Sequence, residues 1–332
     1  MAKVAINGLG RIGRATFKIL LDHPQLELVA ANDLIPADGL GYLFKYDSAY
    51  GRYEKEVGSD SENLLIEGKK YRVFNEKEPA NLPWGELGID IVFECSGIFT
   101  KREQLEKHLE AGAKKVILSA PAKSEGVPTV VFGVNHPEPD DRIISCASCT
   151  TNCISPVVEI LDRRVGVSKA IMSTVHAYTA TQAIVDTYKK KPRRGRAGAA
   201  NFVPTSTGAA KATSKALPQF EGKFDGVAIR GPVIVGSIAD IVVVAKRATT
   251  VDEVNDIFRE EADSDRYRGI LGANEEPLVS SDIIGDSRAS IVDLEMTRVV
   301  EGDLVKVMSW YDNEWGYSAQ MVKTALSMAE KS

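Results

Sequence analysis

The 332-residue sequence has only four cysteines and four histidines, and it has no long hydrophobic run. Its longest strongly apolar stretch, 241–245, is flanked by charged residues and is far shorter than the roughly 20 residues of a membrane-spanning helix. The cysteines are Cys95, Cys146, Cys149 and Cys153, and none has a histidine at metal-ligand spacing. These absences argue against a disulfide framework, and they predict reduced thiols, no metal site and a cytoplasmic protein.

A strong net charge, internal repeats and low-complexity linkers are also missing. The formal net charge is −5, with 44% hydrophobic and 26% charged residues. This composition excludes a disordered chain and gives no overall attraction to nucleic acid or to an anionic membrane. Arg11 and Arg14 interrupt the N-terminus, so we expect no signal peptide. The length is sufficient for two domains, each with its own core.

The N-terminal segment carries glycines in the GxGxxG spacing, at Gly8, Gly10 and Gly13. A strand-like run, 3–8, leads into them, a helical pattern follows at 14–22, and a second strand-like run, 26–32, ends before Asp33. One glycine permits the tight turn, another lets a pyrophosphate approach the backbone, and the third lets helix and strand pack closely. The carboxylate then binds a ribose diol, so the pattern predicts a dinucleotide site.

Strand-like and helical segments continue to alternate after this motif, at 89–95, 102–111 and 115–118. Such alternation predicts a parallel, doubly wound sheet with helices on its faces. Ligands bind at the carboxyl ends of strands in such sheets. We therefore expect Ser96 and Ser119, which follow two of these strands, to line the cofactor crevice.

The pattern changes after residue 161, where longer alternating strands occur with few helices between them. These strands are expected at 169–179, 227–235, 238–246, 290–298 and 304–310. They predict a mixed or antiparallel sheet. The expected fold class is α/β: a Rossmann domain at 1–147, completed by a C-terminal helix at 314–332, plus an α+β catalytic domain at 148–313.

Cys149 lies at the junction of an expected strand, 141–147, and an expected helix, 151–161. A helix N-terminus favours the thiolate through its macrodipole and its unpaired backbone N–H groups. The same N–H groups can stabilise an oxyanion formed when the thiolate attacks a carbonyl. The alternative is a small cysteine packed under the helix without chemical function.

These motifs together make the sequence resemble the phosphorylating glyceraldehyde-3-phosphate dehydrogenases over nearly its whole length. The matching motifs are INGLGRIGR (6–14), ASCTTN (147–152), TVHAYTATQ (174–182), PTSTGAAKA (204–212), FDGVAIR (224–230) and WYDNEWGYS (310–318). The resemblance implies a glycolytic or gluconeogenic oxidoreductase and a homotetramer. It also implies NAD as cofactor, with some use of NADP, and glyceraldehyde 3-phosphate and inorganic phosphate as substrates.

The resemblance implies roles for individual residues in catalysis. His176 becomes the general base paired with Cys149, whereas a lone histidine in an apolar strand is otherwise a hydrogen-bonded core residue. The substrate phosphate would contact Thr179, Thr181 and Arg230, and the inorganic phosphate Ser148, Thr150, Thr207, Gly208 and Arg194. Arg196 is the alternative to Arg194 within the basic run 189–196.

The implied cofactor residues are Gly8, Gly10, Arg11, Ile12, Gly13, Asp33, Lys77, Ser96, Ser119, Asn313 and Tyr317. Arg11 and Ile12 would lie on the pyrophosphate loop, and Asn313 would bind the nicotinamide carboxamide. Thr187 and Tyr188 stand where NAD-preferring bacterial relatives commonly have Leu-Pro, which leaves the strictness of the NAD preference open.

The implied reaction is oxidation of glyceraldehyde 3-phosphate to 1,3-bisphosphoglycerate through a thioester on Cys149. Two alternatives remain open. An erythrose-4-phosphate dehydrogenase would hydrolyse its acyl-enzyme and would not need phosphate for turnover. An NAD-retaining RNA-binding or regulatory protein would use the basic run 189–196, although the acidic net charge favours a solvated or interface loop and makes nucleic acid an unexpected partner.

Overall fold

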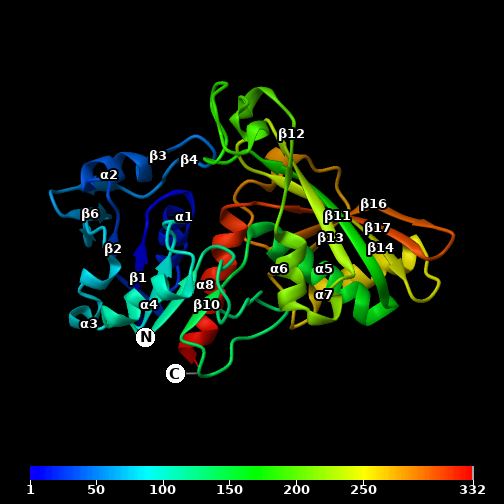
Figure 1. Cartoon of the computed structure of the whole chain (residues 1–332), viewed down its shortest axis with the longest axis horizontal. Coiled ribbons are helices and arrows are strands. Elements are labelled where there is room, and N and C mark those ends of the chain that lie inside the picture. Colours follow the sequence, from blue (N-terminus) through cyan, green and yellow to red (C-terminus); the bar gives the residue numbers. More distant parts are fainter. Residues whose placement is uncertain (331–332) are drawn as a thin grey trace. The chain divides into compact units, whose positions relative to one another are not determined.

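The computed structural model describes residues 1–330, which divide by their contacts into two compact units (Figure 1). The N-terminal unit comprises Met1–Val130, Pro137–Ala147 and the segment from Met321 onward, and the C-terminal unit comprises Val131–His136 and Ser148–Gln320. The chain thus returns to the N-terminal unit at residue 321, later than the expected 314, and residues 131–136 group with the C-terminal unit. Positions 331–332 of the expected C-terminal helix lie outside the described residues.

The N-terminal unit is built on an eight-stranded sheet with the order β10-β9-β8-β1-β2-β7-β6-β5. The parallel strands are β1 (Ala2–Asn7), β2 (Leu26–Asn32), β7 (Lys69–Phe74), β8 (Ile91–Glu94), β9 (Lys115–Leu118) and β10 (Ile143–Ser145). β6 (Asn63–Ile66) and β5 (Val57–Ser59) extend the sheet in antiparallel fashion. The chain leaves β1 for β2 on one side and later returns to β8 on the other, so the switch point lies between β1 and β8.

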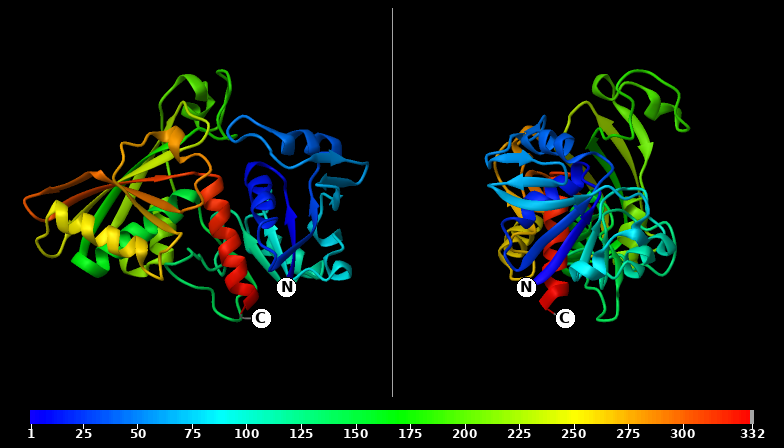
Figure 2. Two further views of the ribbon diagram at one scale, coloured as in Figure 1. Left: turned by 180° about the vertical axis from the view of Figure 1, so that it is seen from behind. Right: turned by 90° about the vertical axis from the view of Figure 1, so that its left-hand side faces the viewer.

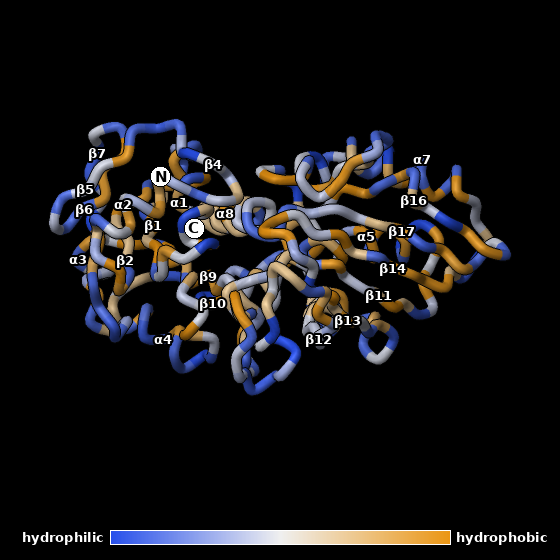
Figure 3. Tube along the Cα trace, turned by 90° about the horizontal axis from the view of Figure 1, so that it is seen from above, coloured by the Kyte–Doolittle hydropathy of each residue, from blue (hydrophilic) through white to orange (hydrophobic). Residues whose placement is uncertain are grey.

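Helices and short elements complete this unit. They are α1 (Arg11–Leu20), α2 (Ala37–Lys45), α3 (Trp84–Leu87), α4 (Arg102–Glu110), η1 (Pro79–Asn81), and the small pair β3 (Tyr46–Asp47) and β4 (Gly51–Arg52). α1 buries Phe17 between Phe44 and Tyr71, with ring centroids 4.8 and 5.0 Å apart. Hydrophobic residues concentrate in the strands, whereas the connecting loops are largely hydrophilic (Figure 3).

The C-terminal unit contains a seven-stranded mixed sheet with the order β12-β13-β11-β14-β17-β16-β15. The strands are β11 (Val167–Ala177), β12 (Val203–Ser206), β13 (Phe224–Gly231), β14 (Ser237–Ala245), β15 (Leu271–Asn274), β16 (Ser290–Val300) and β17 (Leu304–Tyr311). β11 runs parallel to β13 and β15 parallel to β16, whereas the other pairs are antiparallel. The expected fold class, with a doubly wound sheet followed by a mixed sheet, is therefore confirmed.

The helices α5 (Cys149–Val165), α6 (Ala209–Ala216) and α7 (Val251–Asp263) lie along one face of this sheet (Figure 2). The remaining elements are α8 (Trp315–Glu330) and the short 3-10 turns η2 (Pro192–Gly195), η3 (Gly198–Ala200), η4 (Pro218–Phe220) and η5 (Ser280–Ile283). Within residues 1–330, no helix combines the length and the apolar character needed to cross a membrane.

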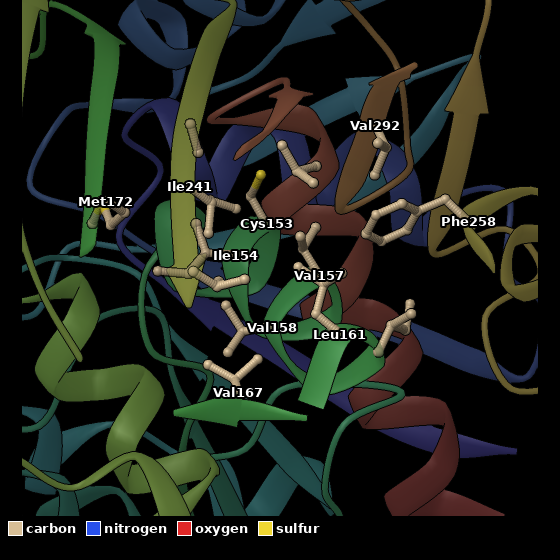
Figure 4. Close-up of a cluster of buried hydrophobic side chains, with 14 of the residues drawn as sticks. Cys153, Ile154, Val157, Val158, Leu161, Val167, Met172, Ile241, Phe258 and Val292 are labelled. Carbon is tan, nitrogen blue, oxygen red and sulfur yellow. The ribbon is translucent and has the colours of Figure 1, made fainter. Parts of the chain in front are cut away.

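α5 forms the centre of the C-terminal core (Figure 4). Cys153, Val157 and Leu161 recur every four residues and are fully buried. They belong to the same buried cluster as Phe258 of α7 and Val292 of β16. This packing holds α5 firmly against the sheet, and it fixes the position of Cys149 at the helix N-terminus.

Candidate active site

A sharp backbone turn delivers Cys149 to the first position of α5. Ala147 adopts a left-handed conformation with φ of 56°, which is uncommon for a residue with a side chain. Ser148 caps the helix, and its Oγ accepts a hydrogen bond from the Thr151 N–H at 3.1 Å. The helix therefore begins two residues earlier than the sequence predicted. Cys149 consequently lies in the first turn, where backbone N–H groups have no carbonyl partner within the helix.

The structure brings Cys149 and His176 together within the C-terminal unit. The Cys149 Sγ lies 3.3 Å from His176 Nε2, and His176 stands near the end of β11. His176 Nδ1 is 2.7 Å from the Ala177 carbonyl oxygen, which can only accept a hydrogen bond. Arg230 Nη1, which can only donate, also lies 2.5 Å from Nδ1, so a donor and an acceptor both contact this atom. The tautomer with its proton on Nδ1, bonded to Ala177, leaves Nε2 able to accept from the Cys149 S–H. This arrangement suits a nucleophile and its general base.

Burial shifts the pKa values of both members of this pair toward their uncharged forms. It lowers the pKa of the His176 imidazole to about 3, and the neighbouring Arg230 cation acts in the same direction. Burial raises the pKa of the Cys149 thiol, against the opposing effects of Arg230 and of hydrogen bonds from Thr150. Both shifts favour the neutral thiol and imidazole over the thiolate–imidazolium pair. The sequence pointed to a thiolate because the helix terminus was visible in it, whereas this burial was not.

Tyr311 supports the pair, although no role was expected for it from the sequence. It is buried at the end of β17, and its hydroxyl lies 2.9 Å from Thr150 Oγ1 and 2.8 Å from Thr174 Oγ1. Its ring meets the His176 ring edge-on, with 5.9 Å between centroids. The Thr150 hydroxyl therefore points into this network instead of toward a phosphate. Only the inclusion of Tyr311 in the motif 310–318 offered a signal.

A hydroxyl-rich cluster surrounds Arg194. Its Nη1 donates to Thr181 Oγ1 at 2.9 Å and its Nε to Thr205 Oγ1 at 3.2 Å, while Thr179 Oγ1 lies 2.9 Å from Thr181 Oγ1. Arg196 instead forms an ion pair with Asp186 at 2.7 Å. Of the two arginines considered from the sequence, Arg194 is thus the one that joins predicted phosphate-binding threonines.

Arg230 offers a second cationic group beside the catalytic pair. Its Nη1 donates to the Ala177 carbonyl oxygen at 3.0 Å, and its buried Nε has no hydrogen-bond partner in the described chain. A buried donor without a partner is costly and suits an anionic ligand. Gly208 precedes α6, and Thr207 Oγ1 accepts from the Ala209 N–H at 3.1 Å. These groups also suit phosphate oxygens.

The N-terminal unit has a separate pocket of about 270 Å³ at the carboxyl end of its sheet. Its lining includes Asn7, Gly8, Gly10, Asn32, Asp33, Leu34, Glu76, Lys77, Cys95, Ser96, Ile98 and Phe99. Five predicted cofactor residues therefore share this pocket: Gly8, Gly10, Asp33, Lys77 and Ser96. Asp33 is held in place because its carboxylate accepts from the Leu9 N–H at 2.6 Å and the Ile35 N–H at 2.8 Å.

The three glycines of the motif meet different spatial requirements. Gly8 has φ of 93°, and a Cβ there would come within 2.5 Å of the Ser96 nitrogen. A Cβ at Gly13 would collide with the Gly8 carbonyl, whereas a Cβ at Gly10 would point into open space. Gly10 thus leaves room for a ligand to reach the backbone, so the residues present fit a dinucleotide pyrophosphate.

The other predicted cofactor residues are not part of this pocket. Arg11 forms an ion pair with Asp47, and Ile12 lies in the first turn of α1. Ser119 follows β9, and its N–H donates to the Glu94 carbonyl. Asn313 and Tyr317 are buried residues of the C-terminal unit, where Asn313 Oδ1 accepts from the Ser237 hydroxyl at 2.9 Å.

Comparisons with known proteins agree with this architecture. Residues 2–102 match the model of the glyceraldehyde 3-phosphate dehydrogenase NAD binding domain, and residues 148–313 match that of its C-terminal domain. Glyceraldehyde-3-phosphate dehydrogenase of Zymomonas mobilis is 48% identical over 332 residues, covering 99% of this chain and 98% of the relative. The Streptomyces coelicolor enzyme of the same name is 49% identical over 324 residues, covering 96% of each. The chain belongs to the glyceraldehyde-3-phosphate dehydrogenase family.

Proposed function

We propose that this chain catalyses the NAD-dependent oxidative phosphorylation of glyceraldehyde 3-phosphate to 1,3-bisphosphoglycerate. The observation that carries the proposal is the 3.3 Å contact between Cys149 Sγ and His176 Nε2 at the N-terminus of α5. A nucleophile, its base and a row of backbone N–H donors are together the groups that acyl transfer through a thioester requires.

In the proposed mechanism, Cys149 Sγ attacks the aldehyde carbon while its proton moves to His176 Nε2. The N–H groups of the first turn of α5 stabilise the developing oxyanion, which regains the proton and becomes the hemithioacetal hydroxyl. When bound, NAD supplies the acceptor for the two electrons and the hydrogen of the aldehyde carbon. His176 Nε2 takes the hydroxyl proton during this oxidation. A phosphate oxygen then displaces the Cys149 sulfur from the thioester, and the thiol is restored with a proton from His176.

Two anion sites would position the phosphates. Thr179, Thr181 and Arg230 would hold the phosphate of the substrate, and Ser148, Thr150, Thr207, Gly208 and Arg194 the inorganic phosphate. The partnerless Nε of Arg230 supports an anion site beside the catalytic pair. Arg194 contacts Thr181, a residue of the substrate-phosphate set, and Thr205, so its contacts support a phosphate role without separating the two sites. Since the Thr150 hydroxyl is bound to Tyr311, we assign the phosphate contact at this position to its backbone N–H. Guanidinium groups suit the task because they bind phosphate through two parallel hydrogen bonds.

The pocket of the N-terminal unit would hold the adenosine half of NAD, with Asp33 on the ribose diol and Lys77 on the adenine side. Arg11, Ile12 and Gly13 would face the pyrophosphate, and Ser119, Asn313 and Tyr317 the nicotinamide. A carboxylate at position 33 disfavours NADP because a 2′-phosphate would bring like charges together. We therefore assign NAD as the main cofactor, with residual use of NADP.

We further propose a homotetramer in the cytoplasm. Along β11, Met172 joins the core beneath the helices, whereas the adjacent Ile171 is 60% exposed on the uncovered face. Ile171, its cross-strand neighbour Val242 and Leu304 line a groove on that face. An exposed apolar sheet surface is suited to packing against another copy of the chain. The free cysteines agree with a reducing compartment.

A spectrophotometric assay of nicotinamide reduction tests the function. With glyceraldehyde 3-phosphate and NAD, we expect turnover that depends on added inorganic phosphate and that is weaker with NADP. Faster oxidation of erythrose 4-phosphate without any need for phosphate would refute the proposal. Light scattering of the same preparation gives the oligomeric mass, and a monomer would refute the tetramer.

A further inference from the structure

A chain of buried polar side chains runs through the N-terminal unit and ends at the cofactor pocket. Glu94, the last residue of β8, and His108, in α4, are both fully buried. His108 Nε2 lies 3.0 Å from Glu94 Oε2, and Trp84 Nε1 lies 3.1 Å from His108 Nδ1. We refer to Trp84, His108 and Glu94 as the relay. None of the three received a role from the sequence.

The indole N–H of Trp84 determines which ring nitrogen of His108 accepts a hydrogen bond and which donates one. The Trp84 N–H can only donate, so His108 Nδ1 must accept. Neutral His108 then carries its proton on Nε2 and donates it to Glu94. The Glu94 carboxylate also accepts from Asn7 Nδ2 at 2.5 Å, and from the Ser96 backbone N–H and hydroxyl at 2.7 and 2.5 Å. These four donors satisfy an ionised carboxylate in a fully buried position.

The groups held by Glu94 belong to the wall of the cofactor pocket. Asn7 and Ser96 both line it. Asn7 Oδ1 accepts from Asn32 Nδ2 at 2.8 Å, and Asn32 Oδ1 in turn accepts from the Glu76 N–H at 2.8 Å. Asn32 and Glu76 line the same pocket. The hydrogen bonds thus connect the ends of β8, β1 and β2 on both sides of the switch point.

We propose that the relay residues Glu94, His108 and Trp84 are positioning residues for NAD binding. None of them lines the pocket; they act by fixing the amide orientation of Asn7 and the position of Ser96. An amide can rotate and exchange its donor and acceptor, and the fixed acceptor on Glu94 prevents this for Asn7. The inference rests on the proposed placement of NAD in this pocket.

His108→Leu and Glu94→Gln test the relay. The leucine leaves the Trp84 indole without a partner and removes one of the two donors to Glu94 Oε2, which keeps only Asn7 Nδ2. The glutamine presents an NH₂ group to donors that need an acceptor. One lost buried hydrogen bond of this kind corresponds to about a tenfold effect on an equilibrium. We expect each change to raise the NAD dissociation constant, measured by titration calorimetry on the full-length enzyme, about tenfold. The turnover number at saturating NAD should stay within about twofold, because no relay residue belongs to the catalytic pair.

Three further variants separate positioning from general stability. His108→Gln can accept from Trp84 and donate to Glu94, so it should restore most of the NAD affinity. Trp84→Phe keeps an aromatic ring, smaller than the indole, but removes the N–H, and we expect an increase of about threefold in the NAD dissociation constant. Glu110→Gln, on an exposed position of the same helix, is the matched control and should bind NAD like the parent.

Asp33→Ala distinguishes failure of the inference from failure of the proposed cofactor site. If Asp33→Ala leaves NAD binding unchanged, the placement of NAD is wrong and the inference falls with it. If Asp33→Ala weakens binding while His108→Leu only lowers the melting temperature, the relay is structural and the inference alone is overturned. If His108→Leu does not fold, an NAD affinity of Trp84→Phe equal to that of the parent likewise shows that the relay is only structural and overturns the inference.

Discussion

The reactivity of the four thiols provides the most direct test of the proposed nucleophile. Burial raises the pKa of Cys146 and of Cys153 to about 12, and it raises that of Cys95 as well. Alkylation requires the thiolate, and at about pH 8 a thiol of pKa about 12 is ionised only to about one part in ten thousand. Cys149 is the most exposed of the four thiols, and although burial raises its pKa as well, Arg230 and the helix N-terminus act against that shift. We therefore expect Cys149 to react with iodoacetamide at least about a thousandfold faster than the others.

Peptide mass spectrometry after timed exposure of the native enzyme measures these rates. Cys149→Ser should abolish the rapid phase and reduce turnover by at least about a thousandfold, while NAD binding persists. His176→Asn should slow alkylation at neutral pH, because the acceptor 3.3 Å from the sulfur is gone. Comparable alkylation of two or more cysteines, or near-normal activity of Cys149→Ser, would contradict the covalent mechanism. An unchanged pH profile in His176→Asn would contradict the pairing.

Three other changes are informative. Arg230→Ala should lower kcat/KM for the phosphorylated aldehyde by the equivalent of about 2–4 kcal/mol. Thr207→Ala should mainly raise the KM for inorganic phosphate. If either change altered only the affinity for NAD, the assignment of that residue to a phosphate site would be contradicted. The parent enzyme should prefer NAD over NADP by at least about tenfold in kcat/KM, and Asp33→Ser should reduce this preference. Equal use of NADP by the parent would show that Asp33 does not determine the cofactor preference. The Arg163 hydrogen bond lowers the pKa of Glu261, so this pair stabilises the fold above the usual carboxyl pKa and loses its effect as the pH falls through the lowered value. Urea unfolding of Glu261→Gln should show a loss of about 1–3 kcal/mol at neutral pH that disappears in acid, and a pH-independent loss would contradict this reasoning.

The sequence predicted five of the six parallel strands of the N-terminal unit and missed β7. The expected limits of β2 and β9 agree with the structure at both ends. These strands are continuous apolar runs bounded by turn residues, so their signal is local. α7 was not anticipated among the alternating strands, although Thr250 and Glu253 form a cap signature before Val254, Ile257 and Phe258. No elements were expected between β2 and β8, although this segment contains α2 and the six-residue β7. Its other strands, β3 to β6, are only two to four residues long and carry little pattern of their own.

The site was only partly predictable. Cys149 and His176 are 27 positions apart, and their pairing was inferred from the family resemblance, because no periodicity links them. The choice between Arg194 and Arg196 was also not predictable from local sequence, because only the fold determines which guanidinium contacts Thr181. The state of the thiol was inferred incompletely, because the depth at which β11 and β17 enclose it is a property of tertiary packing.

Tyr311 and Glu94 show what local sequence patterns cannot reveal. Both are polar, both are buried at a strand end, and both have hydrogen-bond partners from elements distant in the sequence. A buried polar group without partners would cost several kcal/mol, so such a group persists only where all of its partners are held at the correct distance. Each satisfied group therefore marks a place where several elements must keep fixed relative positions. In the C-terminal unit that place adjoins Cys149 and His176, and in the N-terminal unit it adjoins the dinucleotide pocket. Both groups are therefore buried, at a cost in free energy, at places where a small displacement of a strand end would move a ligand-binding or reacting atom.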